Sequence, residues 1–98
     1  EHLRAQIPSL QARWEPHIGV NVSEVRIKRM KTRWGSCNIR TRRIWLSLAL
    51  AKKSAACLEY VFVHELVHLI ERGHGKRFKQ LMDGFLPEWR GLKAELND

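Results

Sequence analysis

The sequence has 98 residues, which is enough for one domain and leaves no room for a second independent core. Apolar residues make up 44%, which excludes a disordered chain, and no apolar run approaches the roughly 18 residues of a membrane span. The formal net charge of +8 favours partners that carry phosphates.

The N-terminal segment EHLRAQIPSL has neither the basic start nor the apolar centre of a signal peptide, and it lacks an initiator Met. We therefore expect a processed form or a part of a longer chain. The two cysteines, Cys37 and Cys57, are too few for a disulfide framework, and they fit a reduced, cytoplasmic protein.

The first half of the chain predicts a helix followed by a β-hairpin. Apolar residues recur at helical spacing over about the first 15 residues, and Pro16 and Gly19 are expected to end this helix. One extended strand is predicted over 20–33, turn chemistry follows in GSCNIRTRR, and IWLSLAL predicts a second strand. Residues 27–48 therefore predict an antiparallel hairpin with a long loop.

The second half predicts three helices. Ser54 is an N-cap candidate, and AACLEYVFVHELVHLIER continues without a helix breaker until Gly73. Because apolar residues surround this helix on nearly every side, we expect it to be buried and central. Shorter helices are predicted in GKRFKQLMDGFL and after Pro87. The fold class is thus α+β, with one compact domain over 1–98.

The central helix contains the pattern H-E-x-x-H, in which His64 and His68 are four residues apart. Residues at this spacing lie on one helical face, so the two imidazoles can bind one metal ion. Glu65 is turned about 100° from His64, where it could take a proton from metal-held water rather than act as a ligand. A metal also explains why such polar groups are buried, since they are costly to bury unpaired.

A catalytic zinc ion needs a third protein ligand and one open position. His74 is the favoured third ligand, because it follows His68 by six residues, just beyond Gly73, where the chain can turn back. Glu71 is the rival, since it shares the helical face of the two histidines. Alternatively, Glu71 or Tyr60 could hydrogen-bond an imidazole and orient it.

Several motifs occur in the order that is typical of the YgjP-like metallopeptidase family: RWGSC, the strand IWLSLAL, EYVFVHELVHL, GHGKRF and LPEWRGLKAEL. The chain resembles that family over about residues 26–96. The resemblance implies a zincin-like core, with a central HExxH helix, a small antiparallel sheet and flanking helices. It also implies zinc bound by His64, His68 and His74, with Glu65 as catalytic base. Members often have a further N-terminal β-rich segment, which makes 1–98 the C-terminal part of a longer chain.

The RWGSC segment allows two interpretations. A strand edge beside the metal-binding helix would let an extended substrate pair there, with Trp34 or Arg33 lining the cleft. We favour the structural interpretation, in which Gly35 allows a sharp turn and Trp34 fills the core. A fourth metal ligand from Cys37 would close the position that water needs.

Three functions use these features differently. The favoured one is a zinc metallopeptidase, a hydrolase that acts on a peptide or protein. The second is hydrolysis of nucleotide phosphoanhydrides at the same site, because the block over residues 26–53 is basic and contains no acidic residue. The third is a nucleic-acid module with a structural zinc, against which Glu65 argues; a SprT-like protease associated with nucleic acid is a related alternative.

Three basic residues flank the third histidine as candidates for stabilising an oxyanion: Arg72, Lys76 and Arg77.

Overall fold

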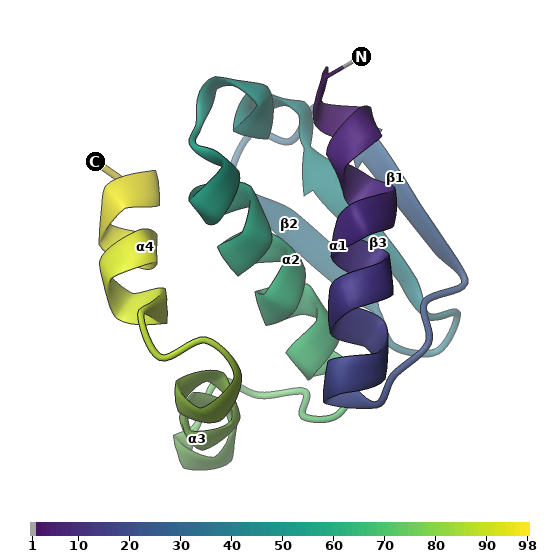
Figure 1. The fold of residues 1–98 in the computed structure, drawn as a ribbon, viewed down its shortest axis with the longest axis vertical. Coiled ribbons are helices and arrows are strands. Elements are labelled where there is room, and N and C mark those ends of the chain that lie inside the picture. Colours follow the sequence, from purple (N-terminus) through teal and green to yellow (C-terminus); the bar gives the residue numbers. More distant parts are fainter. Residues whose placement is uncertain (1) are drawn as a thin grey trace.

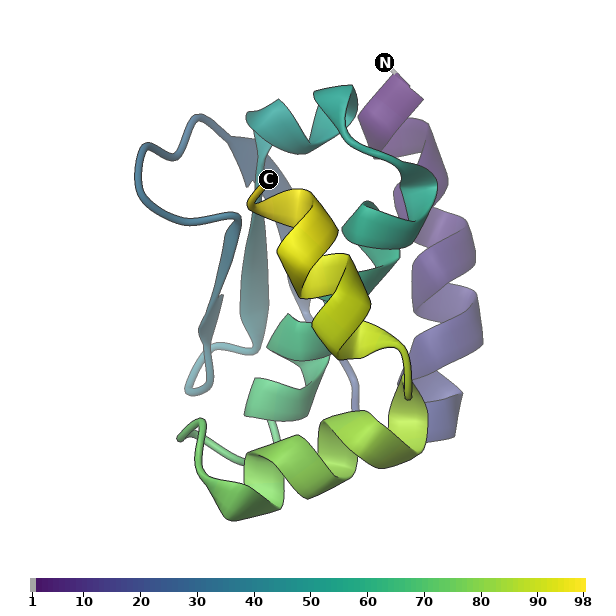
Figure 2. The same cartoon turned by 90° about the vertical axis from the view of Figure 1, so that its left-hand side faces the viewer.

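The computed structural model describes residues 2–98 as a small sheet with helices packed against one of its faces (Figures 1 and 2). Along the chain the elements are α1 (His2–Ile18), β1 (Glu24–Lys28), β2 (Gly35–Asn38), β3 (Arg43–Ser47), the 3-10 helix η1 (Leu48–Lys52), α2 (Ala55–His68), α3 (Lys76–Phe85) and α4 (Trp89–Leu96). In Figure 2 the sheet lies to the left of the helices. The predicted α+β class is confirmed.

The sheet has the order β1-β3-β2, which makes β3 its central strand. β2 pairs antiparallel with β3, whereas β1 pairs parallel with it. The predicted strand over 20–33 is wrong in extent, because only 24–28 form β1, and GSCN, which was assigned to a turn, forms β2. The predicted antiparallel pairing of that first strand is also wrong: β1 runs parallel to β3, and the hairpin is made by β2 and β3. Glycine, serine and asparagine have low strand propensity, which packing on α2 overrides.

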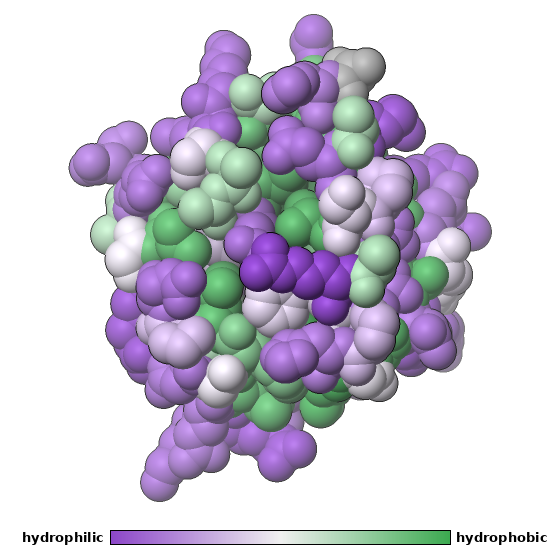
Figure 3. Space-filling model, viewed as in Figure 1, coloured by the Kyte–Doolittle hydropathy of each residue, from purple (hydrophilic) through white to green (hydrophobic). Residues whose placement is uncertain are grey.

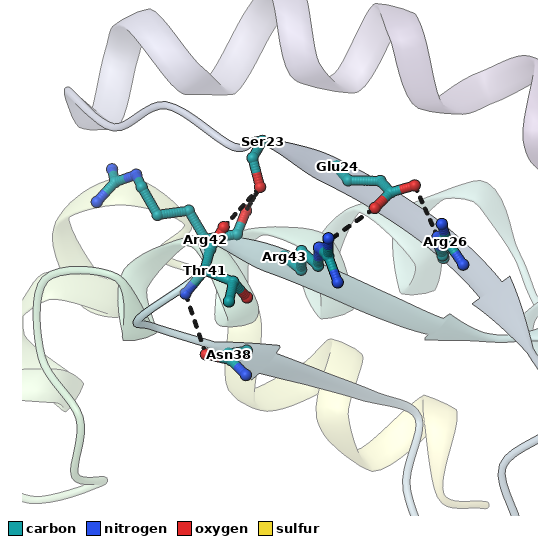
Figure 4. A network of polar contacts seen from close by, with 7 residues as sticks. All are labelled: Ser23, Glu24, Arg26, Asn38, Thr41, Arg42 and Arg43. Carbon is teal, nitrogen blue, oxygen red and sulfur yellow. Dashed lines mark hydrogen bonds and ion pairs between the residues drawn. The ribbon is translucent and has the colours of Figure 1, made fainter.

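The turn between β2 and β3 also anchors the start of β1 (Figure 4). Asn38 accepts a hydrogen bond at its Oδ1 from the backbone N–H of Thr41, and Arg42 completes the turn with a φ of 59°. The carbonyl of Arg42 then accepts hydrogen bonds from the backbone N–H and the hydroxyl of Ser23, at 2.8 and 3.0 Å. These contacts hold the start of β1 against the turn between β2 and β3 at one end of the sheet.

The basic block over residues 26–53 is partly neutralised within the sheet itself. Glu24 forms ion pairs with Arg26 at 2.7 Å and with Arg43 at 3.3 Å (Figure 4). The pair with Arg43 joins β1 to its neighbour β3, whereas the pair with Arg26 lies within β1.

Helix α2 is buried and central, as predicted. The hydroxyl of Ser54 accepts a hydrogen bond from the backbone N–H of Cys57 at 3.2 Å, which confirms the predicted N-cap. Helices α1, α3 and α4 and strands β2 and β3 all contact α2. Its side chains include several with no exposed surface: Phe62, Val63, Leu66 and Val67. Burying each such side chain stabilises the fold by about 1.5–3 kcal/mol.

Two helix ends differ from the predicted ones. α1 continues through Pro16 to Ile18, and it ends at Gly19, which has a φ of 84°. α1 contains Pro8 as well as Pro16, and each of these prolines deprives the helix of one backbone N–H donor without ending it. α2 already ends at His68, and Gly73 has no positive φ, so the following turn needs no left-handed glycine.

The last two helices form where they were predicted. α3 buries Phe78 and Met82, and α4 buries Trp89 and Leu96. Figure 1 shows α3 below the C-terminal end of α2, with α4 alongside α2. In residues 2–98, no helix has both the length and the apolar content that crossing a membrane requires.

Candidate metal centre

The structure brings together the three histidines that the sequence singles out. His64 and His68 project from the last turns of α2, and His74 comes from the segment that connects α2 to α3. One ring nitrogen from each lies within 4.8 Å of the others. The ring centroids are 4.5–5.2 Å apart in every pair.

A backbone carbonyl orients the second histidine. The Nδ1 of His68 lies 3.0 Å from the carbonyl oxygen of Glu71, which can only accept a hydrogen bond. The proton therefore sits on Nδ1, and the lone pair of Nε2 faces the Nε2 of His74 at 2.9 Å. Orientation of a ligand imidazole by a hydrogen bond on its other nitrogen is usual in metal sites.

The donor set fits a bound metal ion. Metal binding needs neutral imidazoles. Partial burial of His74 lowers its pKa below the ordinary value, and the neighbouring His68 and His64 lower it further, which favours the neutral imidazole that a metal binds. Three converging imidazole nitrogens suit a transition-metal ion of the kind that histidine favours.

Phe78 forms one wall of this cluster, a role that the sequence did not reveal. Its ring, on α3, lies 4.7–5.0 Å from the ring centroids of all three histidines and is 2% exposed. The helical pattern identified Phe78 only as a core residue. No helical spacing could have revealed this role, because His74 lies before α3 begins at Lys76.

The two alternative ligands lie outside the cluster. The Glu71 carboxylate forms an ion pair with Arg77 at 3.3 Å, and only the backbone carbonyl of Glu71 meets a histidine. Cys37 is not part of the cluster either. Burial and the nearby Glu65 carboxylate raise the pKa of the Cys37 thiol to about 11, which disfavours the thiolate that metals bind.

Glu65 lies beside the histidines and beneath the first residue of β2. Glu65 is 5% exposed, and its Oε2 lies 3.3 Å from the Nδ1 of His64. A Cβ atom on Gly35 would lie 3.2 Å from this Oε2 and 2.9 Å from Cγ1 of Val61. The expected sharp turn at Gly35 is therefore wrong: this glycine lets strand β2 approach α2 closely.

We expect Gly35→Ala to lower the free energy of unfolding by about 1–3 kcal/mol, because the added methyl group overpacks the contact between β2 and α2. Denaturant unfolding followed by circular dichroism measures this. Gly84→Ala is the matched control: its Cβ would meet nothing within 4 Å inside α3, so stability should rise by about 0.5–1 kcal/mol. Equal stability of Gly35→Ala and the parent protein would contradict the close approach.

A cleft of about 490 Å³ opens beside the histidines, between β2, α2 and α4. Arg33 and Trp34 line it, as the functional interpretation of RWGSC predicted. Trp34 also packs against the core, as the structural interpretation predicted, and its Nε1 donates to Oδ1 of Asn97 at 3.0 Å. The two interpretations therefore both apply to this tryptophan.

Strand β2 presents a free edge to this cleft. Within residues 2–98 it pairs only with β3, and the backbone N–H of Ser47 donates to the carbonyl of Trp34. In an antiparallel ladder the bonded pairs alternate, so the backbone groups of Gly35 and Cys37 point away from β3. Both residues line the cleft.

Tyr60 lies in the cleft one helical turn before His64. Its ring packs edge-on against His64 at 5.8 Å and stacks on Trp89 at 6.5 Å, so it packs beside the imidazole. Burial and the Glu65 carboxylate raise the pKa of Tyr60 to about 12, which keeps its hydroxyl protonated at neutral pH.

Of the three basic residues near His74, Arg72 lines the cleft.

A model of the YgjP-like family, described as a metallopeptidase domain, matches residues 1–98. The chain belongs to the YgjP-like family. This YgjP-like chain is therefore a metallopeptidase, an enzyme that uses a metal ion to hydrolyse peptide bonds in a peptide or protein. The resemblance seen in the sequence is thus confirmed.

Two solved structures share the fold of this YgjP-like domain. The metallopeptidase zymogen of Pyrococcus abyssi abylysin is 20% identical, with a TM-score of 0.81 over 92% of this chain and 90% of that one. The metallopeptidase zymogen of Methanocaldococcus jannaschii jannalysin is 18% identical, with a TM-score of 0.71 over 96% and 92%. A search of curated proteins found no match. Neither nucleotide hydrolysis, nor a nucleic-acid partner, nor a SprT-like protease gains support from these comparisons.

Proposed function

We propose that this chain is a zinc-dependent metallopeptidase in which His64, His68 and His74 bind the zinc ion and Glu65 is the general base. The observation that supports this most is the cluster of three imidazole nitrogens within 4.8 Å, beside a buried carboxylate at the edge of a cleft. Three histidine ligands that leave a position open are a known arrangement of catalytic zinc.

A zinc ion bound there would polarise the substrate carbonyl and lower the pKa of a coordinated water to about 7. The chain supplies the proton transfers. Glu65 accepts the proton of the attacking water, and it passes that proton to the amide nitrogen as the C–N bond breaks. Because Glu65 is almost fully buried, its charge acts at low dielectric, where electrostatic effects on the reaction are strong.

The substrate lies along the free edge of β2 in this proposal. An extended peptide can add to a sheet edge through main-chain hydrogen bonds, and the outward groups of Gly35 and Cys37 are available for them. Gly35 also lies next to the Glu65 carboxylate, so a peptide paired there has its backbone close to the base. Trp34 and Tyr60 line the same cleft and provide apolar contact for substrate side chains.

We also propose that residues 1–98 form a single catalytic domain, the C-terminal part of a longer chain, and that the protein is cytoplasmic. One hydrophobic core that joins all four helices to the sheet supports the first proposal. Cys37 and Cys57 are both free thiols, which is typical of reducing compartments.

The proposal predicts that the purified protein cleaves a denatured protein substrate, and that a chelator abolishes cleavage until zinc is added back. Mass spectrometry of the products measures this, with nucleoside triphosphates and single-stranded DNA assayed in parallel. Chelator-resistant peptide cleavage would refute the metal mechanism. Zinc-dependent release of phosphate without peptide cleavage would refute the proposed substrate.

A further inference from the structure

The cleft beside the histidines is lined by cations and by almost no acid. Arg33, from the segment before β2, Arg72, from the segment after α2, and Lys93, on α4, all line it. Among the described residues that line the cleft, Glu65 is the only one with a carboxylate. That carboxylate is buried next to His64, so it is not available to a substrate side chain.

Within the described residues these three cations have no carboxylate partner, a property that they share with other exposed cations such as Arg29 and Arg40. Ion pairs with carboxylates hold five arginines elsewhere: Arg13, Arg26, Arg43, Arg77 and Arg90. Within residues 2–98, neither Arg33, Arg72 nor Lys93 forms such a pair. Figure 3 shows hydrophilic side chains spread widely over the helical face, so charge alone does not distinguish the cleft. The cleft is distinguished by its lining, which among the described residues contains three cations and one carboxylate, that of the buried Glu65.

A second hollow also borders the histidines and is lined by cations. It has a volume of about 240 Å³, and Tyr60, His64, His74 and Lys93 line both hollows. The second hollow adds Lys79, and it contains no acidic residue among those described. A peptide bound beside the histidines can therefore reach cations in both hollows.

We propose that this metallopeptidase selects peptides that carry Asp or Glu side chains beside the scissile bond, with Arg33, Arg72 and Lys93 as the specificity-determining residues. The inference rests on the proposed peptidase function. An acidic side chain gains a charge-assisted hydrogen bond with these cations, whereas lysine or arginine is repelled and finds no free carboxylate. The positions of the cations in three separate chain segments allow acidic residues to be recognised along the cleft.

A peptide series tests this selectivity without altering the protein. Three peptides share an apolar centre and differ only in their flanking residues, which are Glu, Gln or Lys, and each is made with a free or an amidated C-terminus. We expect kcat/KM for the Glu peptide to exceed that for the Lys peptide by about tenfold or more at low salt, and the ratio to shrink as salt rises. If the peptides with a free C-terminus are cleaved faster than the amidated ones whatever their flanking residues, the cations recognise the terminal carboxylate and not acidic side chains. Equal rates, or a faster Lys peptide, would overturn it.

A matched pair of variants locates the preference. Arg33→Gln, Arg72→Gln and Lys93→Gln combined should make the Glu and Gln peptides equivalent, chiefly through KM. The control combines Arg29→Gln, Lys31→Gln and Arg40→Gln, which removes the same charge from exposed residues outside both hollows. The control should retain the preference, and its loss there would assign the effect to overall charge.

Binding separates this inference from the proposed function. Fluorescence anisotropy of the dye-labelled peptides on the Glu65→Gln protein measures recognition without turnover. Tighter binding of the Glu peptide supports the inference even if no peptide is cleaved, in which case the peptidase proposal fails by itself. Single-stranded DNA that displaces the Glu peptide at a lower concentration than unlabelled Glu peptide would overturn acidic peptides as the ligand class.

Discussion

Glu65→Gln should lower the rate of peptide hydrolysis by about 10²-fold or more while the protein retains its metal ion. The amide has nearly the same shape as the carboxylate but cannot accept the proton of the attacking water. The three histidines are unchanged, and glutamine can still accept a hydrogen bond from the Nδ1 of His64, the group now 3.3 Å from Oε2. Turnover of a peptide substrate and metal content of the same sample measure the two effects together.

Glu59→Gln is a suitable control, because it makes the same chemical change on the same helix, outside the cleft. Its carboxylate accepts a hydrogen bond from Nε1 of Trp14, which a glutamine oxygen can also accept. We expect near-parental activity for this variant. A metal-loaded Glu65→Gln protein with undiminished activity would rule out Glu65 as the base.

His74→Ala should lower the affinity for zinc by more than 10²-fold, since loss of a mere supporting group around a metal already costs about 10- to 100-fold. Removing this side chain leaves two imidazoles from α2, which are too few to hold the ion under dilution. Competition with a chromophoric chelator measures the affinity, and elemental analysis of the dialysed protein measures the stoichiometry.

Glu71→Ala provides the comparison for the third ligand. The substitution removes the carboxylate that pairs with Arg77 and keeps the backbone carbonyl that orients His68. We expect this variant to bind zinc at about one ion per chain. If His74→Ala kept one zinc ion per chain and Glu71→Ala lost its zinc, Glu71 would be the third ligand in place of His74.

The helical part of the fold was predictable because its signals are local. The apolar positions around α2 and the cap at Ser54 lie within the segment whose structure they determine. The spacing of His64, His68 and Glu65 also predicted their common location, since helical geometry fixes where residues at these intervals lie.

The sheet was harder, because strand pairing depends on residues far apart in the chain. Nothing in GSCN indicates a strand by propensity, and its pairing with 43–46 arises only in the folded molecule. The parallel pairing of β1 with β3 has no local signal either. The role of Gly35 follows from the packing of β2 on α2, because the atoms that exclude a side chain there belong to Val61, Glu65 and Trp45.

The two halves of the candidate site differ in how much of the chain they need. One helix and the segment that follows it supply all three histidines, whereas the substrate edge requires β2 to be seated on β3 and against α2. Damage to the sheet can therefore abolish substrate binding and leave metal affinity intact. A damaged enzyme of this kind would still carry its ion, so metal content reports the integrity of the helical part alone.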